Sequence, residues 1–302
     1  MQTDIPMISV ILPVFNSEKY LNSAIESILL QNFINFELII INDGSTDSSY
    51  NIIKHWASRD KRIITVNREN KGLVYSLNEA IDLSKGQFIA RMDADDIALP
   101  DRLQEQFNYL TINNLDICGC HYFEINEYDE LAGLRLVPTT QNMITISLSS
   151  SVPFAHPSVL IRKEFLSKNN LKYGEGIANY AEDLDLWIRM FNAGAKFGNV
   201  NKILFKYRLL SNSLSRIRRK KILNDSANLF ASYFKINKAL ILKELENIHH
   251  PLNKYELEWV GAIYMRQLLR LQGFKFLSNL KKLPKKTVVN VFFSELNKII
   301  KL

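Results

Sequence analysis

The sequence has only two cysteines among its 302 residues, and no apolar run in it reaches the length of a membrane span, which is about 20 residues. Cys118 and Cys120 alternate within a run that reads as a strand. With no other cysteine to pair with, we expect buried thiols rather than a disulfide or a metal site. The segment 1–7 contains Asp4 and Pro6 and lacks the apolar core of a signal peptide. We therefore expect a cytoplasmic protein that is either soluble or peripheral on the inner face of the cell membrane.

The sequence also lacks the glycine-rich loops that hold phosphate groups. No G-x-G-x-x-G pattern follows the first expected strand, and no G-x-x-x-x-G-K-[ST] pattern occurs. These absences argue against dinucleotide-binding and P-loop proteins. A bound diphosphate would then need a metal ion to neutralise its charge.

Charge is unevenly distributed along the chain, although the net charge is only +7. Residues 206–302 contain 20 Lys and Arg against 6 Asp and Glu, whereas residues 1–205 contain 18 against 25. This change in charge balance near residue 206 is the best indication of a domain boundary in the sequence. We expect an α/β domain over residues 1–215 and a basic helical region over residues 216–302.

Short apolar runs alternate with amphipathic segments in the first hundred residues. Segments 8–14, 36–41, 63–66 and 87–92 are typical of strands, and segments 17–30 and 73–83 have helical spacing. Ser17 is placed to cap the first helix. This alternation predicts parallel strands with right-handed crossovers, as in a doubly wound α/β sheet. Ligands bind beyond the carboxyl ends of such strands.

One expected strand, 87–92, ends in three carboxylates: Asp93, Asp95 and Asp96. Unpaired carboxylates this close repel one another, and a hard cation such as Mg²⁺ or Mn²⁺ resolves the repulsion. In extended chain, Asp93 and Asp95 would point the same way. A helix-capping turn is the simpler alternative. The location at a strand end, like that of Asp43, favours a metal site.

Four segments resemble the nucleotide-sugar-binding half of family 2 glycosyltransferases, which are inverting enzymes with the GT-A fold. They are 8–16 (ISVILPVFN), 41–47 (INDGSTD), 70–73 (NKGL) and 91–96 (RMDADD). The resemblance covers about residues 7–215. It implies a Rossmann-like, mostly parallel sheet with flanking helices, in which about 1–110 bind the nucleotide sugar and about 111–215 form the acceptor side.

The resemblance also implies roles on the donor side. Asp43 would lie against the base or ribose, Asp95 would be the principal Mg²⁺ or Mn²⁺ ligand, and Asp93 would contact the ribose or the metal. The full set of implied donor-binding residues is Pro13, Phe15, Asn16, Asp43, Lys71, Gly72, Arg91, Asp93, Arg208 and Ser213. Many relatives carry a metal-binding histidine two residues after the arginine of the segment 205–215, where this chain has Leu210. As an alternative, Asp43 and Asp47 could be turn and helix-cap residues.

The acceptor side is implied by two further segments, 155–158 (AHPS) and 180–189 (YAEDLDLWIR). By resemblance, Asp183 is the general base, and His156, Glu182 and Trp187 contact the acceptor. A helix N-terminus would lower the pKa of Asp183, while the acidic neighbours Glu182 and Asp185 would raise it. His156 could instead be a packed loop residue, the acids could only cap the helix, and Asp185 is the next candidate for the base.

The C-terminal region has helical spacing in segments 222–234, 257–268 and 288–300, flanked by basic clusters at 216–221 and 281–286. Such helices either lie on an anionic membrane surface or pack on the sheet with a solvated basic rim. We expect packing for the apolar faces and a membrane role for the lysines. A lipid-linked acceptor would account for both.

Two other functional classes fit this sequence less well than the transferase does. A metal-dependent nucleotidyltransferase would normally carry a glycine-rich basic loop after the first strand, and segment 13–20 is not one. A non-enzymatic nucleic-acid-binding protein would leave the acidic strand ends without a purpose, so we expect no nucleic-acid partner. The resemblance favours a UDP-sugar donor, a glycan or lipid-linked acceptor, and a role in bacterial surface polysaccharide or lipooligosaccharide synthesis.

Overall fold

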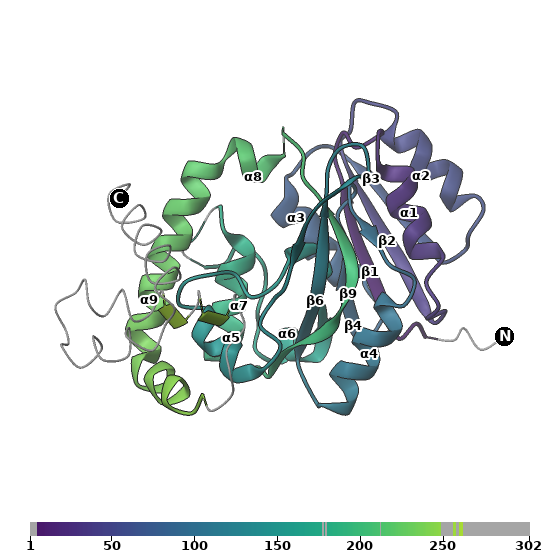
Figure 1. Ribbon diagram of the computed structural model, residues 1–302. Helices are drawn as coiled ribbons and strands as arrows, with labels where there is room; N and C mark the ends of the chain where they lie inside the picture. Colours follow the sequence, from purple (N-terminus) through teal and green to yellow (C-terminus); the bar gives the residue numbers. More distant parts are fainter. Residues whose placement is uncertain are drawn as a thin grey trace.

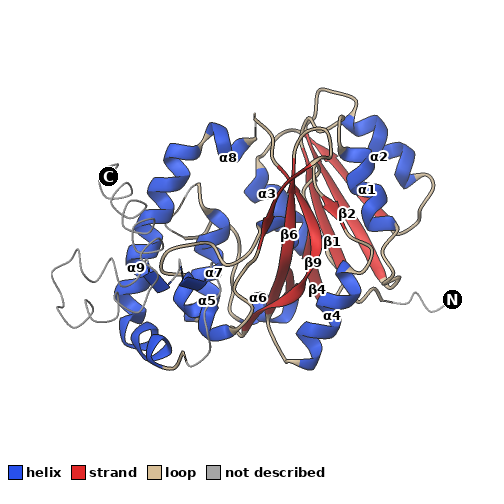
Figure 2. Cartoon of the chain, in the orientation of Figure 1, coloured by secondary structure: helices blue, strands red, loops and turns tan. Residues whose placement is uncertain are grey.

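The computed structural model describes residues 5–176, 178, 180–211, 213–248, 256–257 and 260–261. In this part of the chain, nine strands form one sheet in the order β3-β2-β1-β4-β8-β6-β9-β5, with β7 paired to β6 (Figures 1 and 2). The strands are β1 Ile8–Val14, β2 Phe36–Asp43, β3 Ile63–Arg68, β4 Phe88–Arg91, β5 Ile97–Ala98, β6 Ile117–Ile125, β7 Leu131–Arg135, β8 Leu160–Arg162 and β9 Phe197–Arg208. The helices are α1 Leu21–Leu29, α2 Ser49–Ala57, α3 Leu73–Leu83, α4 Arg102–Ile112, α5 Gln141–Ser147, α6 Lys163–Lys168, α7 Glu182–Asn192, α8 Leu214–Ile217 and α9 Arg219–Glu246, together with the 3₁₀ turn η1 His156–Ser158.

The first four strands along the edge of the sheet, β3, β2, β1 and β4, are parallel. Every residue of β1 and β2 is buried, because helices cover both faces of the sheet. Strands buried on both faces read as continuous apolar runs, which is why they were recognisable in the sequence. The α/β class and the parallel first half are confirmed.

The direction of chain crossover reverses at β1. The connection through α1 places β2 on one side of β1, and the connection through α3 places β4 on the other. Such a switch point opens a crevice at the carboxyl ends of the strands. Strand β4 pairs with β1 only as far as Ile11, whereas β2 continues beside β1 to Val14. Pro13 therefore lies in the part of β1 that pairs with β2 but no longer with β4. Proline has no N–H to donate, so it is tolerated where a strand lacks a neighbour on one side.

The second half of the sheet is mixed. Strand β8 runs antiparallel to both β4 and β6, β9 runs parallel to β6, and the short β5 is antiparallel to β9. Through β5 and β9, the chain just after β4 meets the end of β9, more than a hundred residues later. This pairing brings Arg208 to the acidic turn that follows β4.

Two apolar clusters lie on opposite faces of the sheet. One contains buried side chains of α1, α2 and α4, and the other contains those of α3, α5, α6, α7 and α9. Cys118 and Cys120 on β6 belong to the first cluster, and both are buried free thiols. The prediction for the two cysteines is confirmed.

The start of α1 differs from the expectation. The helix begins at Leu21, and residues 17–20 form a turn in which the N–H of Tyr20 donates to the carbonyl of Ser17 at 3.1 Å. The Ser17 hydroxyl donates to the carbonyl of Phe15 at 3.1 Å, and the Ser17 N–H donates to Ser49 Oγ at 2.8 Å. Ser17 therefore joins the loops after β1 and β2, and its prediction as a helix cap is wrong.

The C-terminal region begins with α8 and α9. Helix α9 runs along α5 and α7 (Figure 1), and its buried residues Leu229, Phe230, Tyr233 and Phe234 join the core cluster on that face. This agrees with the expected packing of the apolar face of segment 222–234. The lysine cluster 281–286 and the segments beyond residue 261 lie outside the described residues. Among the described helices, none combines the length and apolarity needed to cross a bilayer. The division at residue 215 stays a prediction.

Candidate functional site

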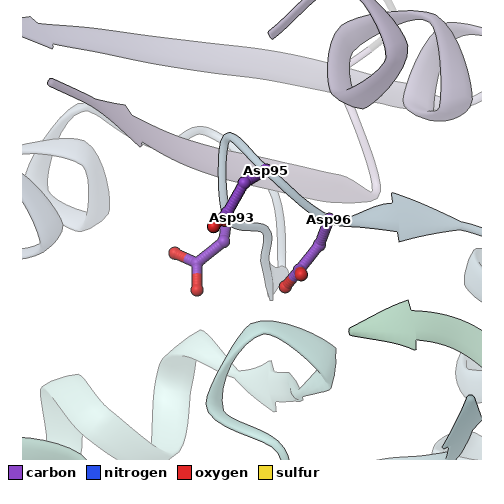
Figure 3. Close-up of side chains that lie close together, drawn as sticks. All are labelled: Asp93, Asp95 and Asp96. Carbon is purple, nitrogen blue, oxygen red and sulfur yellow. The ribbon is translucent and has the colours of Figure 1, made fainter. Parts of the chain in front are cut away.

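The three carboxylates Asp93, Asp95 and Asp96 project from a single turn between β4 and β5 (Figure 3). One oxygen from each lies within 4.8 Å of the others. The backbone here is a turn rather than extended chain, and the N–H of Asp96 lies 3.5 Å from the carbonyl of Asp93. The expected extended backbone at Asp93 and Asp95 is therefore wrong, but the turn brings the same two carboxylates together and adds Asp96 to them.

The electrostatics of this acidic turn fit a divalent cation. Burial, followed by the charge of Asp93, raises the pKa of Asp95 to about 6. Burial and the two neighbouring carboxylates also raise the pKa of Asp96 well above its usual range. Asp96 Oδ2 is buried and has no hydrogen-bond partner among the described residues. A buried unpaired oxygen beside two carboxylates suits Mg²⁺ or Mn²⁺, which prefer oxygen ligands.

Two buried arginines hold the acidic turn in place. Arg91 Nη1 lies 2.5 Å from a carboxylate oxygen of Asp93. The Arg208 N–H donates to Asp96 Oδ1 at 2.7 Å, and Arg208 Nε donates to the carbonyl of Asp95 at 2.6 Å. Arg208 also forms a 2.6 Å ion pair with Asp129. Both predicted donor-binding arginines are therefore engaged with the chain itself, and in this structure they shape the turn.

The loops after β1 and β2 carry further predicted donor residues. Pro13 is buried at the end of β1, while Phe15 and Asn16 are exposed just beyond it. Asn16 has a left-handed backbone (φ 48°), and its side-chain oxygen accepts from the N–H of Thr46 at 2.8 Å. This bond joins the loops that follow β1 and β2. Ser213 lies just before α8 and is half-buried.

Asp43, predicted to contact the nucleoside, is buried and bonded to its own chain. Its two carboxylate oxygens accept from the N–H groups of Lys71 and Gly72 at 2.8 and 2.9 Å, and it pairs with Arg68. Gly72 adopts φ 88°, a conformation that favours glycine and presents its N–H here. In this structure Asp43 fixes the segment 70–73 to the end of β2.

A hollow of about 600 Å³ lies beside Asp43. Asn42 is one of its lining residues, and the Oδ1 atom of Asn42 is buried and has no hydrogen-bond partner among the described residues. The residues lining the hollow are Asn42, Gly44, Ser45, Tyr50, Asn67, Arg68, Glu69 and Asn70. Sequence reasoning missed most of them. The one available signal was the density of amide side chains after β2 and β3.

Helix α7 places Glu182 and Asp183 in its first turn. Burial, followed by the charge of Asp183, raises the pKa of Glu182 to about 7. Burial also raises the pKa of Asp183, so burial is the largest of the opposing influences. The charge of Arg91 lowers both pKa values and that of Asp93 raises both. The α7 acids therefore lie close enough to the acidic turn to interact with it electrostatically.

Asp185, the second candidate for a base, has a structural environment instead. It is buried and its carboxylate accepts from Arg189 Nε at 2.8 Å, one helical turn later. A β-carbon on Gly176 would overlap this carboxylate, so Asp185 is enclosed on its outer side.

His156 and Trp187 lie beneath the α7 acids. His156 Nε2 is 3.1 Å from the hydroxyl of Tyr173, and burial, together with the charge of Arg91, holds the pKa of His156 well below its usual value. Trp187 is completely buried, and the centroid of its ring lies 6.0 Å from the centroid of the His156 ring. Direct contact of Trp187 with an acceptor is therefore a wrong prediction for this structure, because the ring has no exposed surface. Tyr173, which the sequence did not single out, joins this group.

Replacement of Trp187 by Ala is expected to lower the free energy of unfolding by about 3–5 kcal/mol, because it opens a cavity in the core beneath the site. Trp187→Phe should cost much less, since it keeps a ring and removes an indole N–H that has no partner among the described residues. Urea unfolding measures both. Tyr128→Ala, at a side chain that is 72% exposed, is the control and should change stability by less than about 0.5 kcal/mol. Equal effects of the Trp187→Ala and Tyr128→Ala variants would contradict the assignment of Trp187 to the core.

Comparison with known families gives a match over most of the sheet. The model of Glycosyl transferase family 2 matches residues 9–168. The chain is 35% identical to an uncharacterized glycosyltransferase, MJ1057, of Methanocaldococcus jannaschii over 73% of this chain and 78% of that protein. It is also 35% identical to the O-antigen biosynthesis glycosyltransferase WbnJ of Escherichia coli, over 70% of this chain and 82% of that protein.

Solved structures show the same fold at low sequence identity. Mannosyltransferase PcManGT from Pyrobaculum calidifontis, in complex with GDP-Man and Mn²⁺, superimposes with a TM-score of 0.64 at 15% identity, covering 99% of this chain and 86% of that one. TarS of S. aureus, in complex with UDP-GlcNAc, gives a TM-score of 0.56 at 18% identity, covering 96% and 81%. The architecture is therefore that of GT-A glycosyltransferases.

Proposed function

Because the chain belongs to glycosyl transferase family 2, we propose that it transfers a sugar from a UDP-sugar to a hydroxyl of a glycan or lipid-linked acceptor, with inversion at the anomeric carbon. One observation carries this proposal. The acidic turn after β4 and the first turn of α7 lie close enough for their charges to act on one another. A single-displacement transfer needs a site for the leaving diphosphate and one base, and these two turns offer both.

On the donor side, Asp95 and Asp93, joined by Asp96, would hold a Mg²⁺ or Mn²⁺ ion. When bound, such an ion would neutralise charge on the leaving diphosphate. The chain's own contribution is to keep the three carboxylates together, through Arg91 and Arg208. The remaining donor candidates, which would contact the donor, lie at the ends of β1 and β2 and in the loops after β1, after β3 and before α8: Pro13, Phe15, Asn16, Asp43, Lys71, Gly72 and Ser213. The hollow beside Asp43 is lined by polar side chains, among them Asn67 and Asn70, which the nucleoside would contact.

On the acceptor side, Asp183 would act as general base. Its carboxylate would take the proton of the acceptor hydroxyl while that oxygen bonds to the anomeric carbon and the bond from this carbon to the diphosphate oxygen breaks. Only one base is needed, because a single displacement inverts the centre. Glu182 would contact the acceptor beside Asp183, and His156 would support the pocket in its neutral form.

The cellular role we propose is bacterial surface polysaccharide or lipooligosaccharide synthesis at the cytoplasmic face of the membrane. The relative WbnJ is named for O-antigen biosynthesis, and the basic C-terminal region of this chain would suit a peripheral location on an anionic surface.

A donor panel tests the proposed function. The purified chain is incubated with UDP-, GDP- and dTDP-sugars in the presence of Mn²⁺, and release of the nucleoside diphosphate is followed. With no acceptor added, water takes the sugar, and we expect slow release of UDP from UDP-sugars by hydrolysis. A metal-dependent nucleotidyltransferase would instead release pyrophosphate from a nucleoside triphosphate and a sugar phosphate. A nucleic-acid-binding protein would release neither and would bind an oligonucleotide with an affinity that ignores Asp95.

The pH dependence of kcat is expected to show an acidic limb above the usual carboxyl range, because burial raises the pKa of Asp183. Asp183 accepts a proton only when ionised, so activity falls as the pH decreases through its raised pKa. Glu182 carries a like charge in the same turn, with a pKa of about 7, and the two groups titrate as a pair. Glu182→Gln removes that charge and should move the limb to lower pH. The measurement is kcat against pH at saturating donor and Mn²⁺.

The control for this prediction is Asp82→Asn, at an exposed acid on α3 that pairs with Lys172. The acidic limb of its kcat–pH profile should coincide with that of the unmodified protein. A limb that stays fixed in Glu182→Gln, or that moves to higher pH, would contradict the coupling of Glu182 to the base.

A further inference from the structure

Five cations lie within six consecutive residues where α8 meets α9. They are Arg216, Arg218, Arg219, Lys220 and Lys221, and all are exposed. We call the segment 216–221 the basic rim. None of its cations forms an ion pair with an acid among the described residues. An uncompensated cluster of this kind attracts anions.

The basic rim is attached to the start of the catalytic helix α7 through Tyr180. Lys221 Nζ lies 3.1 Å from the Tyr180 hydroxyl, and the guanidinium of Arg218 lies 5.7 Å from the centre of the Tyr180 ring. The Tyr180 N–H donates to Asp225 on α9 at 2.9 Å. Tyr180 and Asp183 are three residues apart, so their Cα atoms are separated by at most about 11 Å. The rim is thus linked, through Tyr180, to the chain just before the proposed base.

Apolar side chains accompany the cations. Ile217 is 70% exposed and Leu223 is 50% exposed, so both leave aliphatic surface uncovered next to the charges. A free inorganic anion would use the cations alone. A ligand that carries phosphate and an apolar chain would use both kinds of side chain.

We propose that the basic rim binds the phosphate group of a lipid-linked acceptor and so directs its sugar hydroxyl to Asp183. This inference rests on the proposed function, which it deepens by naming the acceptor class and the side chains that recognise it. Arg218 and Lys221 are the central residues, since Tyr180 orients both of them. Guanidinium and ammonium groups form strong charge-assisted hydrogen bonds to phosphate oxygens. Asp225 lies close to these cations, and its carboxylate is engaged by the Tyr180 N–H.

The location favours an acceptor over the bulk membrane surface. A surface that only binds anionic headgroups needs charge, and it needs no fixed link to the base. Here Arg218 and Lys221 both contact Tyr180, which lies two residues before Glu182 in the sequence. The donor diphosphate is served separately by the acidic turn.

The test uses farnesyl diphosphate as a short lipid-linked phosphate probe. Its binding is measured by calorimetry in the presence of saturating UDP and Mn²⁺, so that the donor site is filled. We expect Arg218→Gln/Lys221→Gln to weaken binding by about tenfold or more, as expected for the loss of charge-assisted hydrogen bonds. The matched control, Lys235→Gln/Lys243→Gln, removes two exposed charges from the same helix and should bind like the unmodified protein. Farnesol and inorganic pyrophosphate should each bind more weakly than farnesyl diphosphate.

Vesicles distinguish the acceptor from the membrane. Phosphatidylcholine vesicles with and without phosphatidylglycerol are sedimented with each protein. Unchanged farnesyl diphosphate binding in Arg218→Gln/Lys221→Gln would overturn the proposal, and so would a loss confined to phosphatidylglycerol vesicles. Failure of the proposed function would be seen separately, as absence of Mn²⁺-dependent UDP binding in the unmodified protein.

Discussion

Replacement of Asp183 by Asn is expected to lower kcat by about 10²- to 10⁴-fold, the usual contribution of a general base, while the affinity for UDP stays nearly unchanged. The amide keeps the size of the side chain but cannot accept the proton of the acceptor hydroxyl. Asp183 lies in the first turn of α7, whereas the acidic turn that would bind the donor diphosphate follows β4. Loss of the base should therefore appear in turnover and not in donor binding.

Single-turnover transfer and UDP titration on the same preparation measure the two effects. Asp185→Asn serves as the companion variant. It breaks the buried pair with Arg189, so it should destabilise the fold, which urea unfolding would detect. Unchanged turnover in Asp183→Asn would move the base elsewhere. Turnover lost in Asp185→Asn at unchanged stability would point to Asp185.

Replacement of Asp95 by Ala is expected to abolish Mn²⁺-dependent binding of UDP. Outer-shell partners of a metal already change its affinity by about 10–100-fold, so loss of a direct ligand should reach at least the upper end of that range. Asp95 is more exposed than Asp96 and is not paired with an arginine as Asp93 is. It is therefore the carboxylate best placed to face a ligand. Calorimetry with and without EDTA measures the effect.

The control for Asp95→Ala is Asp82→Ala, which removes an exposed acid on α3 and should leave UDP affinity unchanged. Circular dichroism checks that both variants are folded. UDP binding that is equally strong with and without Mn²⁺, or equally strong in Asp95→Ala, would contradict the assigned role.

Much of the donor half could be predicted because its signals are local in the sequence. Strand β4 reads as an apolar run and Asp93, Asp95 and Asp96 follow it directly, so the sequence itself places the carboxylates at a strand end. The start of α7 was equally readable, since Glu182 and Asp183 precede its buried apolar positions. The family resemblance then supplied expected roles for these acids.

The remaining features depend on contacts between distant parts of the chain. Arg208 was expected to contact the donor, yet β5 and β9 bring it to the backbone of Asp95. Asp43 was expected to face the nucleoside, and its oxygens instead accept from residues 71 and 72. The position of Trp187 in the sequence is compatible with a core role and with a role in the site. Only the packing of its neighbours in the folded protein assigns it to the core. No pattern in the sequence pairs Tyr180 with Lys221.

The central claim is that one group of acids handles the leaving diphosphate and a different acid takes the proton. The most direct test is calorimetric titration of UDP, in the presence of Mn²⁺, into the unmodified protein, Asp183→Asn and Asp95→Ala. The claim predicts similar affinity for the first two and no measurable binding for the third. Equal loss of binding in both variants, or retained binding in Asp95→Ala, would contradict it.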